Sequence, residues 1–140
     1  EGKKSVLGGV PKSLPSMVKA IRLQEKSQQV GFEWDNKEQV WEKVEEEANE
    51  LKAEVNAMDA GKGSIEKIEE EMGDLLFSIV NYARFLNIDP DQALARTNKK
   101  FMKRFQAMEE IVAAEGKQMT DLNLAEMDAI WNTVKLSESG

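Results

Sequence analysis

Two short acidic stretches contain the residues whose types and spacing are best suited to chemistry. The first contains Glu47 and Glu50, and the second contains Glu71 and Asp74. If each stretch is helical, side chains three residues apart project from the same side of the helix. Carboxylates held together repel one another unless a cation lies among them, and hard divalent cations prefer oxygen ligands. The spacing therefore favours a divalent metal site.

The two stretches lie in consecutive segments that have helical periodicity. Apolar residues recur every three or four positions over residues 40–58 and again over residues 65–86. Asp35 resembles the first residue of a capping box before the first segment, and Ser64 is a good cap for the second. The loop at 59–63 between them contains two glycines. The pattern predicts two helices that form an antiparallel hairpin.

Helical geometry indicates that the four carboxylates of this hairpin converge. At ~100° per residue, each pair lies behind the apolar stripe of its own helix by a similar angle, roughly 70° to 150°. The two pairs also lie at similar distances along the helices from the loop, and these distances agree to within about one helical turn. Equal offsets in an antiparallel hairpin bring all four side chains to one side. An oxygen-only site of this kind, without His, suits Mg²⁺ or Mn²⁺ rather than zinc or a di-iron centre.

The neighbouring acidic residues have a simpler interpretation, because an acidic helix face is often only a solvated surface. Glu46 and Glu70 point farther from the apolar stripes and are weaker candidates for the site. The four residues expected to be solvated are Glu45, Glu46, Glu69 and Glu70. The pair on the first helix would, by itself, also fit a surface role. The mirrored pair on the next helix favours the metal site, and so does Asp74, because Asp is unfavourable in the middle of a helix.

Composition excludes several classes of site and partner. The chain has no Cys and no His, which removes disulfides, zinc sites built on thiolate or imidazole, thiol nucleophiles and His-based triads. The net charge of −7 disfavours binding to duplex nucleic acid, although metal ions could still bridge the acidic residues to a small phosphorylated ligand. Without a secretory signal or an apolar stretch long enough to cross a membrane, we expect a soluble, cytoplasmic protein with no membrane partner.

The rest of the chain is predicted to form further helices around this hairpin. A length of 140 residues favours one domain, and few prolines among many Glu, Lys, Ala and Leu residues favour helix. We predict an all-α fold with a four-helix core, an additional C-terminal helix and antiparallel neighbours. The domain is expected to span residues 13–136, after a linker-like arm at 1–12 and before a frayed tail at 137–140. The helix at 65–86 is apolar on more than one face, which favours a dimeric bundle.

A basic stretch in the fourth predicted helix could bind phosphate. Lys100 and Arg104 are four residues apart and share a helix face, and the guanidinium group suits bidentate contact with phosphate. In the last predicted helix, Trp131 and Lys135 have the same spacing and could provide a stacking surface and a further cation. The alternative for Trp131 is a place in the hydrophobic core.

These motifs, taken in order, resemble the MazG-type nucleoside triphosphate pyrophosphohydrolases of the all-α NTP pyrophosphatase superfamily. The resemblance covers residues from Pro11 to about Lys135. An EExxE motif alone would be weakly specific, but the ordered set is specific. The set consists of Glu46-Glu47-x-x-Glu50, Glu71-x-x-Asp74, Val30-Gly31-Phe32-x-Trp34, Gly73-Asp74-Leu75-Leu76-Phe77, Ala83-Arg84-Phe85-Leu86, Asn98-x-Lys100-Phe101-x-x-Arg104-Phe105 and Met127-Asp128-x-x-Trp131.

The resemblance implies Mg²⁺-dependent hydrolysis of nucleoside triphosphates to monophosphate and pyrophosphate in a homodimer or a higher homo-oligomer. Carried over by motif, the implied metal ligands are Glu47, Glu50, Glu71 and Asp74. The residues implied to contact the triphosphate and the base are Lys100, Arg104, Trp131 and Lys135. Glu46 is a weaker candidate, as a base for the attacking water. Long members of the family hold two such domains, so a chain that lacks an initiating Met could be the second of them.

Three alternatives remain open at this point. The first is a non-catalytic helical module that binds nucleotide or regulates a partner, and the second is a purely structural acidic bundle. The complete set of four carboxylates argues against both. The third is a related enzyme that is specific for one nucleotide, such as dUTP or phosphoribosyl-ATP. A panel of nucleotides distinguishes it from the broader activity.

Overall fold

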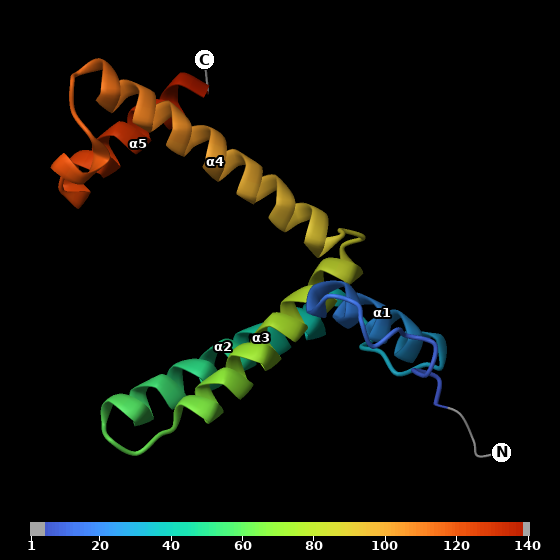
Figure 1. Ribbon diagram of the computed structural model, residues 1–140. Coiled ribbons are helices and arrows are strands. Elements are labelled where there is room, and N and C mark those ends of the chain that lie inside the picture. Colours follow the sequence, from blue (N-terminus) through green and yellow to red (C-terminus); the bar gives the residue numbers. More distant parts are fainter. Residues whose placement is uncertain (1–4, 139–140) are drawn as a thin grey trace. The chain divides into compact units, whose positions relative to one another are not determined.

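The short polar side chains of Asn36, Ser64 and Asn123 each cap the start of a helix in this chain. In the computed structural model, which describes residues 5–138, five α-helices and one 3₁₀ turn follow one another along the chain. They are α1 (Ser16–Gln29), α2 (Lys37–Asp59), α3 (Ile65–Phe85), α4 (Pro90–Ala114), η1 (Met119–Asp121) and α5 (Leu124–Glu138) (Figure 1). The described residues contain no strand, which confirms the predicted all-α class.

Two side-chain caps define the hairpin of α2 and α3. The cap of α2 is Asn36, whose side-chain oxygen accepts a hydrogen bond of 3.0 Å from the backbone N–H of Gln39. The sequence prediction placed this cap one residue earlier, at Asp35, whose backbone N–H instead donates to the Gln39 side chain at 2.8 Å. The cap of α3 is Ser64, as predicted, and its hydroxyl accepts a 3.3 Å bond from the N–H of Lys67.

The turn between α2 and α3 depends on a close backbone approach at Gly63. A Cβ atom added there would lie 2.8 Å from the backbone nitrogen of Met58 and 3.1 Å from the carbonyl oxygen of Glu54. Backbone atoms cannot move aside as a flexible side chain can, so the turn requires glycine at this position. The turn returns α3 along α2, and Figure 1 shows the two helices side by side. The predicted antiparallel hairpin is therefore present.

The described residues up to residue 91 form one compact unit, in which α3 packs against both α1 and α2. Its buried apolar side chains are Val10, Val40, Val44 and Val80. Val10 lies in the segment predicted to be a linker-like arm, yet consecutive turns bury its side chain, and its N–H donates to the carbonyl oxygen of Leu7 at 3.1 Å. The described part of that arm therefore packs on the unit. The prediction for residues 1–4 falls outside the described residues.

The described residues from 92 onward form a second compact unit, which contains most of α4 together with η1 and α5. Its buried apolar residues are Met108, Val112 and Val134. A capping box begins α5, because the side chains of Asn123 and Glu126 accept hydrogen bonds from each other's backbone N–H at 2.8 and 2.9 Å. The helix runs to Glu138, and the frayed tail at 137–140 stays a prediction. A four-helix core that includes α4 stays a prediction.

Several residues of the hairpin that periodicity assigns to the core are exposed in this single chain. On α3, Met72 and Ile79 are 43% and 44% exposed, and Leu76 between them is 49% exposed. On α2, Trp41 is 46% exposed. The reason is that two packed helices cover one face of each other and leave the opposite face open to solvent. The apolar pattern thus extends beyond what this chain buries by itself.

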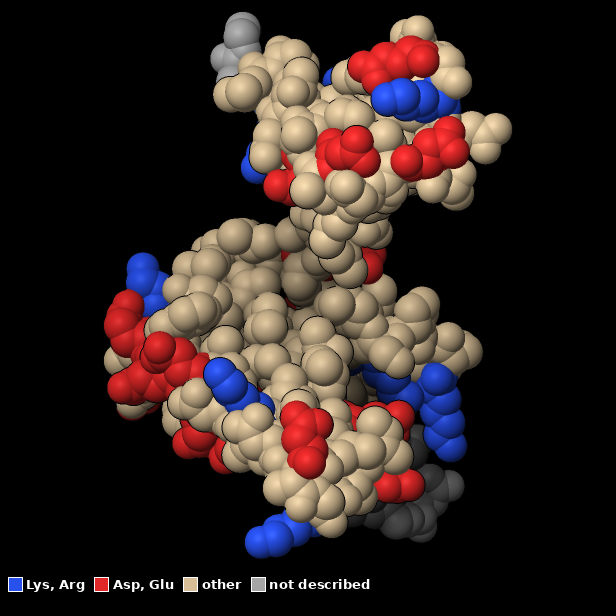
Figure 2. Space-filling model, turned by 90° about the vertical axis from the view of Figure 1, so that its left-hand side faces the viewer, with Lys and Arg blue, Asp and Glu red and all other residues tan. Residues whose placement is uncertain are grey.

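The described surface carries mixed charges. On the face drawn in Figure 2, acidic side chains form several groups, and the Lys and Arg side chains do not merge into a broad basic surface. This distribution agrees with the net charge of −7. Among the described residues, no helix combines the length and the apolar character that a membrane crossing requires.

Candidate functional site

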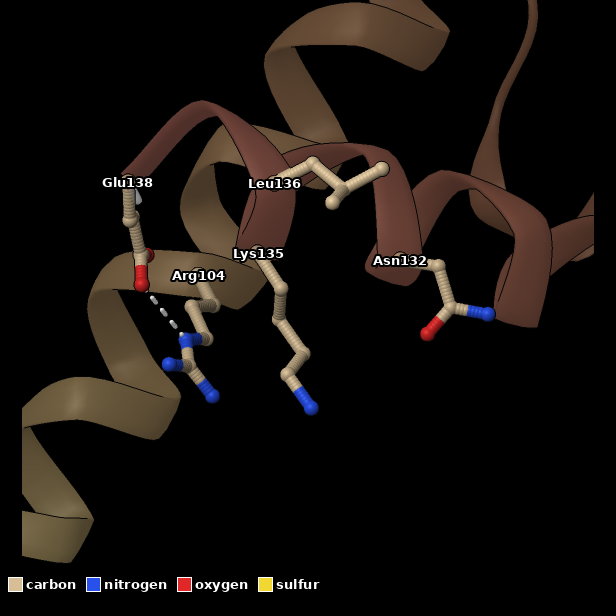
Figure 3. Close-up of a pocket in the computed structure, with 5 residues that line it drawn as sticks. All are labelled: Arg104, Asn132, Lys135, Leu136 and Glu138. Atoms are coloured by element: carbon tan, nitrogen blue, oxygen red, sulfur yellow. Dashed lines mark hydrogen bonds and ion pairs between the residues drawn. The ribbon is translucent and has the colours of Figure 1, made fainter. Parts of the chain in front are cut away.

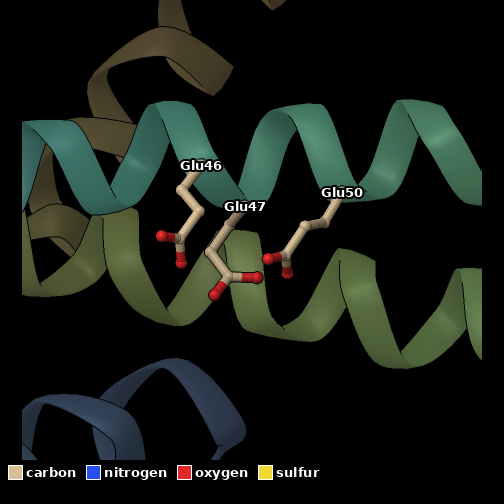
Figure 4. Close-up of side chains that lie close together, drawn as sticks. All are labelled: Glu46, Glu47 and Glu50. Carbon is tan, nitrogen blue, oxygen red and sulfur yellow. The ribbon is translucent and has the colours of Figure 1, made fainter.

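The hairpin of α2 and α3 brings the predicted carboxylates together. Glu47, Glu71 and Asp74 each offer an oxygen atom within 4.8 Å of the other two, and the same holds for Glu46, Glu47 and Glu50. Glu47 belongs to both groups and joins them into one carboxylate cluster. Figure 4 shows the three carboxylates of α2 pointing to the same side of that helix. Of the four carboxylates predicted to converge, Glu47, Glu71 and Asp74 lie together, and Glu50 lies close to Glu47 in the second group. The role of these residues as metal ligands remains a prediction.

Two oxygens of the carboxylate cluster are buried without a hydrogen-bond donor. Glu47 is only 6% exposed, and its Oε2 atom has no hydrogen-bond partner among the described protein groups. The Oε2 atom of Glu71 is in the same situation. A buried carboxylate oxygen without a donor or a cation is costly, so few such atoms are found in folded proteins. An all-oxygen set with unused lone pairs fits a hard cation such as Mg²⁺.

Mutual repulsion within the cluster changes its protonation. Partial loss of solvent and the negative charges of Asp74 and Glu47 raise the pKa of Glu71 above its ordinary value of 4.5. Loss of solvent and the charge of Glu47 likewise raise the pKa of Glu50. Both carboxylates therefore hold protons more tightly than free glutamate does. A cation bound among them would compete with those protons.

Lys43 is a member of this site to which the sequence analysis assigned no role. Its Nζ atom lies 2.5 Å from a carboxylate oxygen of Glu46 and 3.0 Å from one of Glu47, and these contacts raise the pKa of Lys43. The spacing of three and four residues was visible in the sequence, but it is also that of an ordinary surface ion pair. Glu46, which the sequence placed toward solvent, joins the cluster through the same contact.

A cavity of about 820 Å³ adjoins the carboxylate cluster within the first unit. Lys43, Glu47 and Asp74 line one part of it. The other part is lined by α1, by the segment at 31–34 and by the side of α3 that carries Phe77. The sequence analysis assigned no cavity here, because its lining comes from elements that periodicity alone does not place next to one another.

An ion pair holds the segment at 31–34 against α3. The guanidinium group of Arg84 contacts the carboxylate of Glu33 and donates a hydrogen bond of 2.8 Å to the side-chain oxygen of Asn81. All three residues line the cavity. The Arg84–Glu33 contact joins residues that are far apart in the sequence, so it fixes one wall of the cavity relative to α3.

In the second unit, three of the four predicted substrate-contacting residues lie together. Arg104 and Lys135 line a pocket of about 540 Å³, and Figure 3 shows their side chains extending in the same direction. The Nε atom of Arg104 donates to Glu138 at 3.0 Å, and its guanidinium carbon lies 5.5 Å from the centre of the Trp131 ring. Lys100 is exposed on α4 and does not line this pocket.

Trp131 combines features of both roles considered for it. Its ring centre lies 5.6 Å from that of Phe101, so part of the indole packs against α4, as the core alternative required. The ring is nevertheless only partly covered, and it contacts a cation on α4. The packing on Phe101 holds the ring in one orientation, which a stacking role would also need.

Comparison with known proteins gives a consistent result. The model of the MazG nucleotide pyrophosphohydrolase domain matches residues 35–108, which contain the whole carboxylate cluster. The chain is 43% identical over 133 residues to the nucleoside triphosphate pyrophosphohydrolase/pyrophosphatase MazG of Thermotoga maritima, covering 95% of this chain and 49% of that protein. It is 41% identical over 134 residues to the nucleoside triphosphate pyrophosphohydrolase of Escherichia coli K12, covering 96% of this chain and 50% of that protein.

A further relative shares a shorter segment. The uncharacterized protein YabN of Bacillus subtilis is 45% identical over 71 residues, covering 51% of this chain and 14% of that protein. This chain thus spans about half the length of the two longer matches and a small part of the third. The family model covers more than half of the chain, including both acidic motifs. The chain therefore belongs to the MazG nucleotide pyrophosphohydrolase domain family.

Proposed function

We propose that this chain hydrolyses nucleoside triphosphates to the monophosphate and pyrophosphate, with Mg²⁺ as the metal and Mn²⁺ as a substitute. The observation that carries the proposal is the carboxylate cluster, in which two buried oxygens lack any donor. Membership of the family supports the reaction, and the names of the two long relatives describe the same activity in those proteins.

In this proposal, Glu47, Glu50, Glu71 and Asp74 hold the metal, because their oxygens converge at the side of one helical hairpin. When bound, Mg²⁺ would neutralise phosphate charge and lower the pKa of a coordinated water. The side chains of the protein perform the remaining catalytic roles. Glu47 is kept in one orientation by its burial and by Lys43 at 3.0 Å, so it presents the same oxygen throughout a reaction cycle.

Glu46 is the proposed acceptor of a proton from the attacking water. It is exposed, yet one of its oxygens lies within 4.8 Å of Glu47 and Glu50, which places it at the edge of the cluster. The water oxygen would join the α-phosphorus, the bond from that phosphorus to the bridging oxygen would break, and pyrophosphate would leave. Lys43 contacts the same carboxylate at 2.5 Å and so holds it at the edge of the cluster.

Basic side chains are the proposed contacts of the triphosphate. Lys100, Arg104 and Lys135 are the proposed phosphate contacts, because positive charge stabilises the charge that develops on the transferred and leaving phosphates. Trp131, whose ring centre lies 5.5 Å from the guanidinium carbon of Arg104, is a further proposed substrate contact. We also propose a homodimer or a higher homo-oligomer, supported by the exposed apolar residues of α3, and a cytoplasmic location.

Product identification after incubation with nucleotides tests this function. We expect a panel of NTPs and dNTPs to yield monophosphate and pyrophosphate with Mg²⁺ and nothing after chelation of the metal. Orthophosphate together with diphosphate, or turnover without metal, would exclude the mechanism. Turnover of one nucleotide alone, such as dUTP or phosphoribosyl-ATP, would select the more specific relative. Metal and nucleotide binding without turnover would indicate a non-catalytic module.

A further inference from the structure

The cavity beside the carboxylate cluster contains a buried polar group with an unused hydrogen-bonding atom. Gln24 on α1 is 5% exposed and lines the cavity. Its Nε2 atom donates a hydrogen bond of 2.9 Å to the carbonyl oxygen of Phe77. That bond fixes which end of the amide is which, since only the nitrogen can donate. The Oε1 atom is left buried without a hydrogen-bond partner, so it is available to accept a hydrogen bond from a ligand.

The cavity also offers surfaces suited to a flat aromatic ligand. Phe32, Trp34 and Phe77 line it, and they are 80%, 44% and 47% exposed. Large apolar side chains of this kind are costly to leave in water, and aromatic rings stack well on nucleobases. Leu23 adds an apolar wall from the same helix as Gln24. The combination of apolar walls and a few fixed polar groups is typical of a small-molecule site.

One continuous cavity joins these groups to the carboxylate cluster, because Glu47 and Asp74 line it as well. A ligand with its phosphates at the cluster could therefore extend its other end toward Gln24. Its volume of about 820 Å³ lies within the range of small-molecule sites, roughly 300–1,000 Å³.

We propose that this cavity receives the nucleobase and that Gln24 selects it, with Oε1 accepting a hydrogen bond from an N–H group on the edge of the base. The inference rests on the proposed function, which supplies the phosphates at the carboxylate cluster. It assigns Gln24 as a specificity-determining residue. A base whose donor nitrogen is fully substituted leaves the amide oxygen buried and unpaired, which weakens binding.

Binding of matched nucleotides tests the inference without requiring turnover. Three pairs of monophosphates differ by the methyl groups that replace the donor hydrogens: UMP and 3-methyl-UMP, AMP and N6,N6-dimethyl-AMP, and CMP and N4,N4-dimethyl-CMP. Dissociation constants with Mg²⁺ present are measured by calorimetry. We expect at least one unmodified nucleotide to bind about tenfold or more tightly than its methylated partner. No monophosphate binding by a protein that binds Mg²⁺, or equal binding within every pair, overturns the inference.

Variants separate the hydrogen bond from a general steric effect of the methyl groups. Gln24→Leu and Gln24→Met remove the acceptor in two different shapes, and both should reduce the preference for the unmodified nucleotide to less than about twofold. Gln29→Leu, an exposed position on the same helix outside the cavity, is the control and should keep the preference. If both Gln24 variants keep the preference for the unmodified nucleotide while Trp131→Ala loses that preference, the base is selected at Trp131 and Gln24 is not the selecting residue.

Failure of the proposed function has a different signature. Suppose that the wild-type chain turns over none of the triphosphates but discriminates within a pair of monophosphates through Gln24. The proposed base pocket is then supported, and the proposed hydrolysis is excluded. If turnover is observed and substitution of Gln24 has no effect on binding, the proposed hydrolysis is supported and the proposed base pocket is excluded.

Discussion

Glu71 gives the carboxylate cluster a measurable dependence on pH. Burial and the charges of Asp74 and Glu47 raise its pKa above 4.5, and Glu50 beside it shifts in the same direction. Between pH 4.5 and the raised pKa, the folded state therefore binds more protons than the unfolded state. Ionising Glu71 as the pH rises through the raised pKa reduces the free energy of unfolding of the metal-free protein.

We expect Glu71→Gln to stabilise the metal-free protein, and the gain over wild type should grow as the pH rises from about 4.5. Urea unfolding of both proteins in the presence of a chelator, at a series of pH values, measures this difference. Lys43 also faces the cluster, but it stays charged throughout this interval because its pKa is raised. A difference that is constant with pH, or that shrinks as the pH rises, would show that Glu71 does not repel its neighbours.

A substitution at Asp74 tests whether its carboxylate is needed for activity but not for folding. Asp74→Asn keeps the size of the side chain but removes a negative charge from the cluster. Turnover should fall by at least about 100-fold, the order observed when one charge-stabilising group is lost. The metal-free fold should be as stable as wild type or more stable. Steady-state kinetics and urea unfolding measure the two effects, with Glu69→Gln, an exposed acidic residue of α3, as the control. An Asp74→Asn protein with wild-type turnover would exclude Asp74 from the site.

Much of the hairpin could be predicted from sequence because its signals are local. The cap at Ser64 and the proximity of Glu47, Glu71 and Asp74 follow from local helical signals, and both are found in the structure. The cap of α2 was misplaced by one residue, since Asp35 and Asn36 are both good caps and sequence does not decide between them. Gln24 was missed because its role depends on Phe77, far away in the sequence, and on the cavity between them.

The close backbone approach in the turn between α2 and α3 can be tested by substitution. Gly63→Ala places a Cβ atom 2.8 Å from the backbone nitrogen of Met58, so the turn must shift, and we expect a loss of about 1–3 kcal/mol in the free energy of unfolding. Gly73→Ala on α3 is the matched control, because nothing lies within 4 Å of its added Cβ. Alanine there should stabilise the helix by about 0.5–1 kcal/mol. Urea unfolding compares the two, and equal effects would show that the turn has no close approach.

Across the whole chain, apolar periodicity predicts more buried surface than the described residues contain. Met72, Leu76 and Ile79 follow one another at intervals of four and three residues, so they form one stripe along α3. All three are more than 40% exposed. A stripe of this kind is costly to leave in water, and on a soluble protein it commonly marks an interface. A second copy of the chain is the occupant that the predicted dimer requires.

We therefore expect Leu76→Lys and Ile79→Lys to convert a dimer into a monomer, because each places a charge in the apolar centre of the proposed interface, where an unpaired charge is costly. Sedimentation equilibrium of the wild-type and variant chains measures the change. Lys67→Glu, an exposed polar position at the start of the same helix, should leave the dimer intact. A wild-type chain that sediments as a monomer at high concentration would mean that the stripe has another partner. A dimer unaffected by both substitutions would place the interface on another surface.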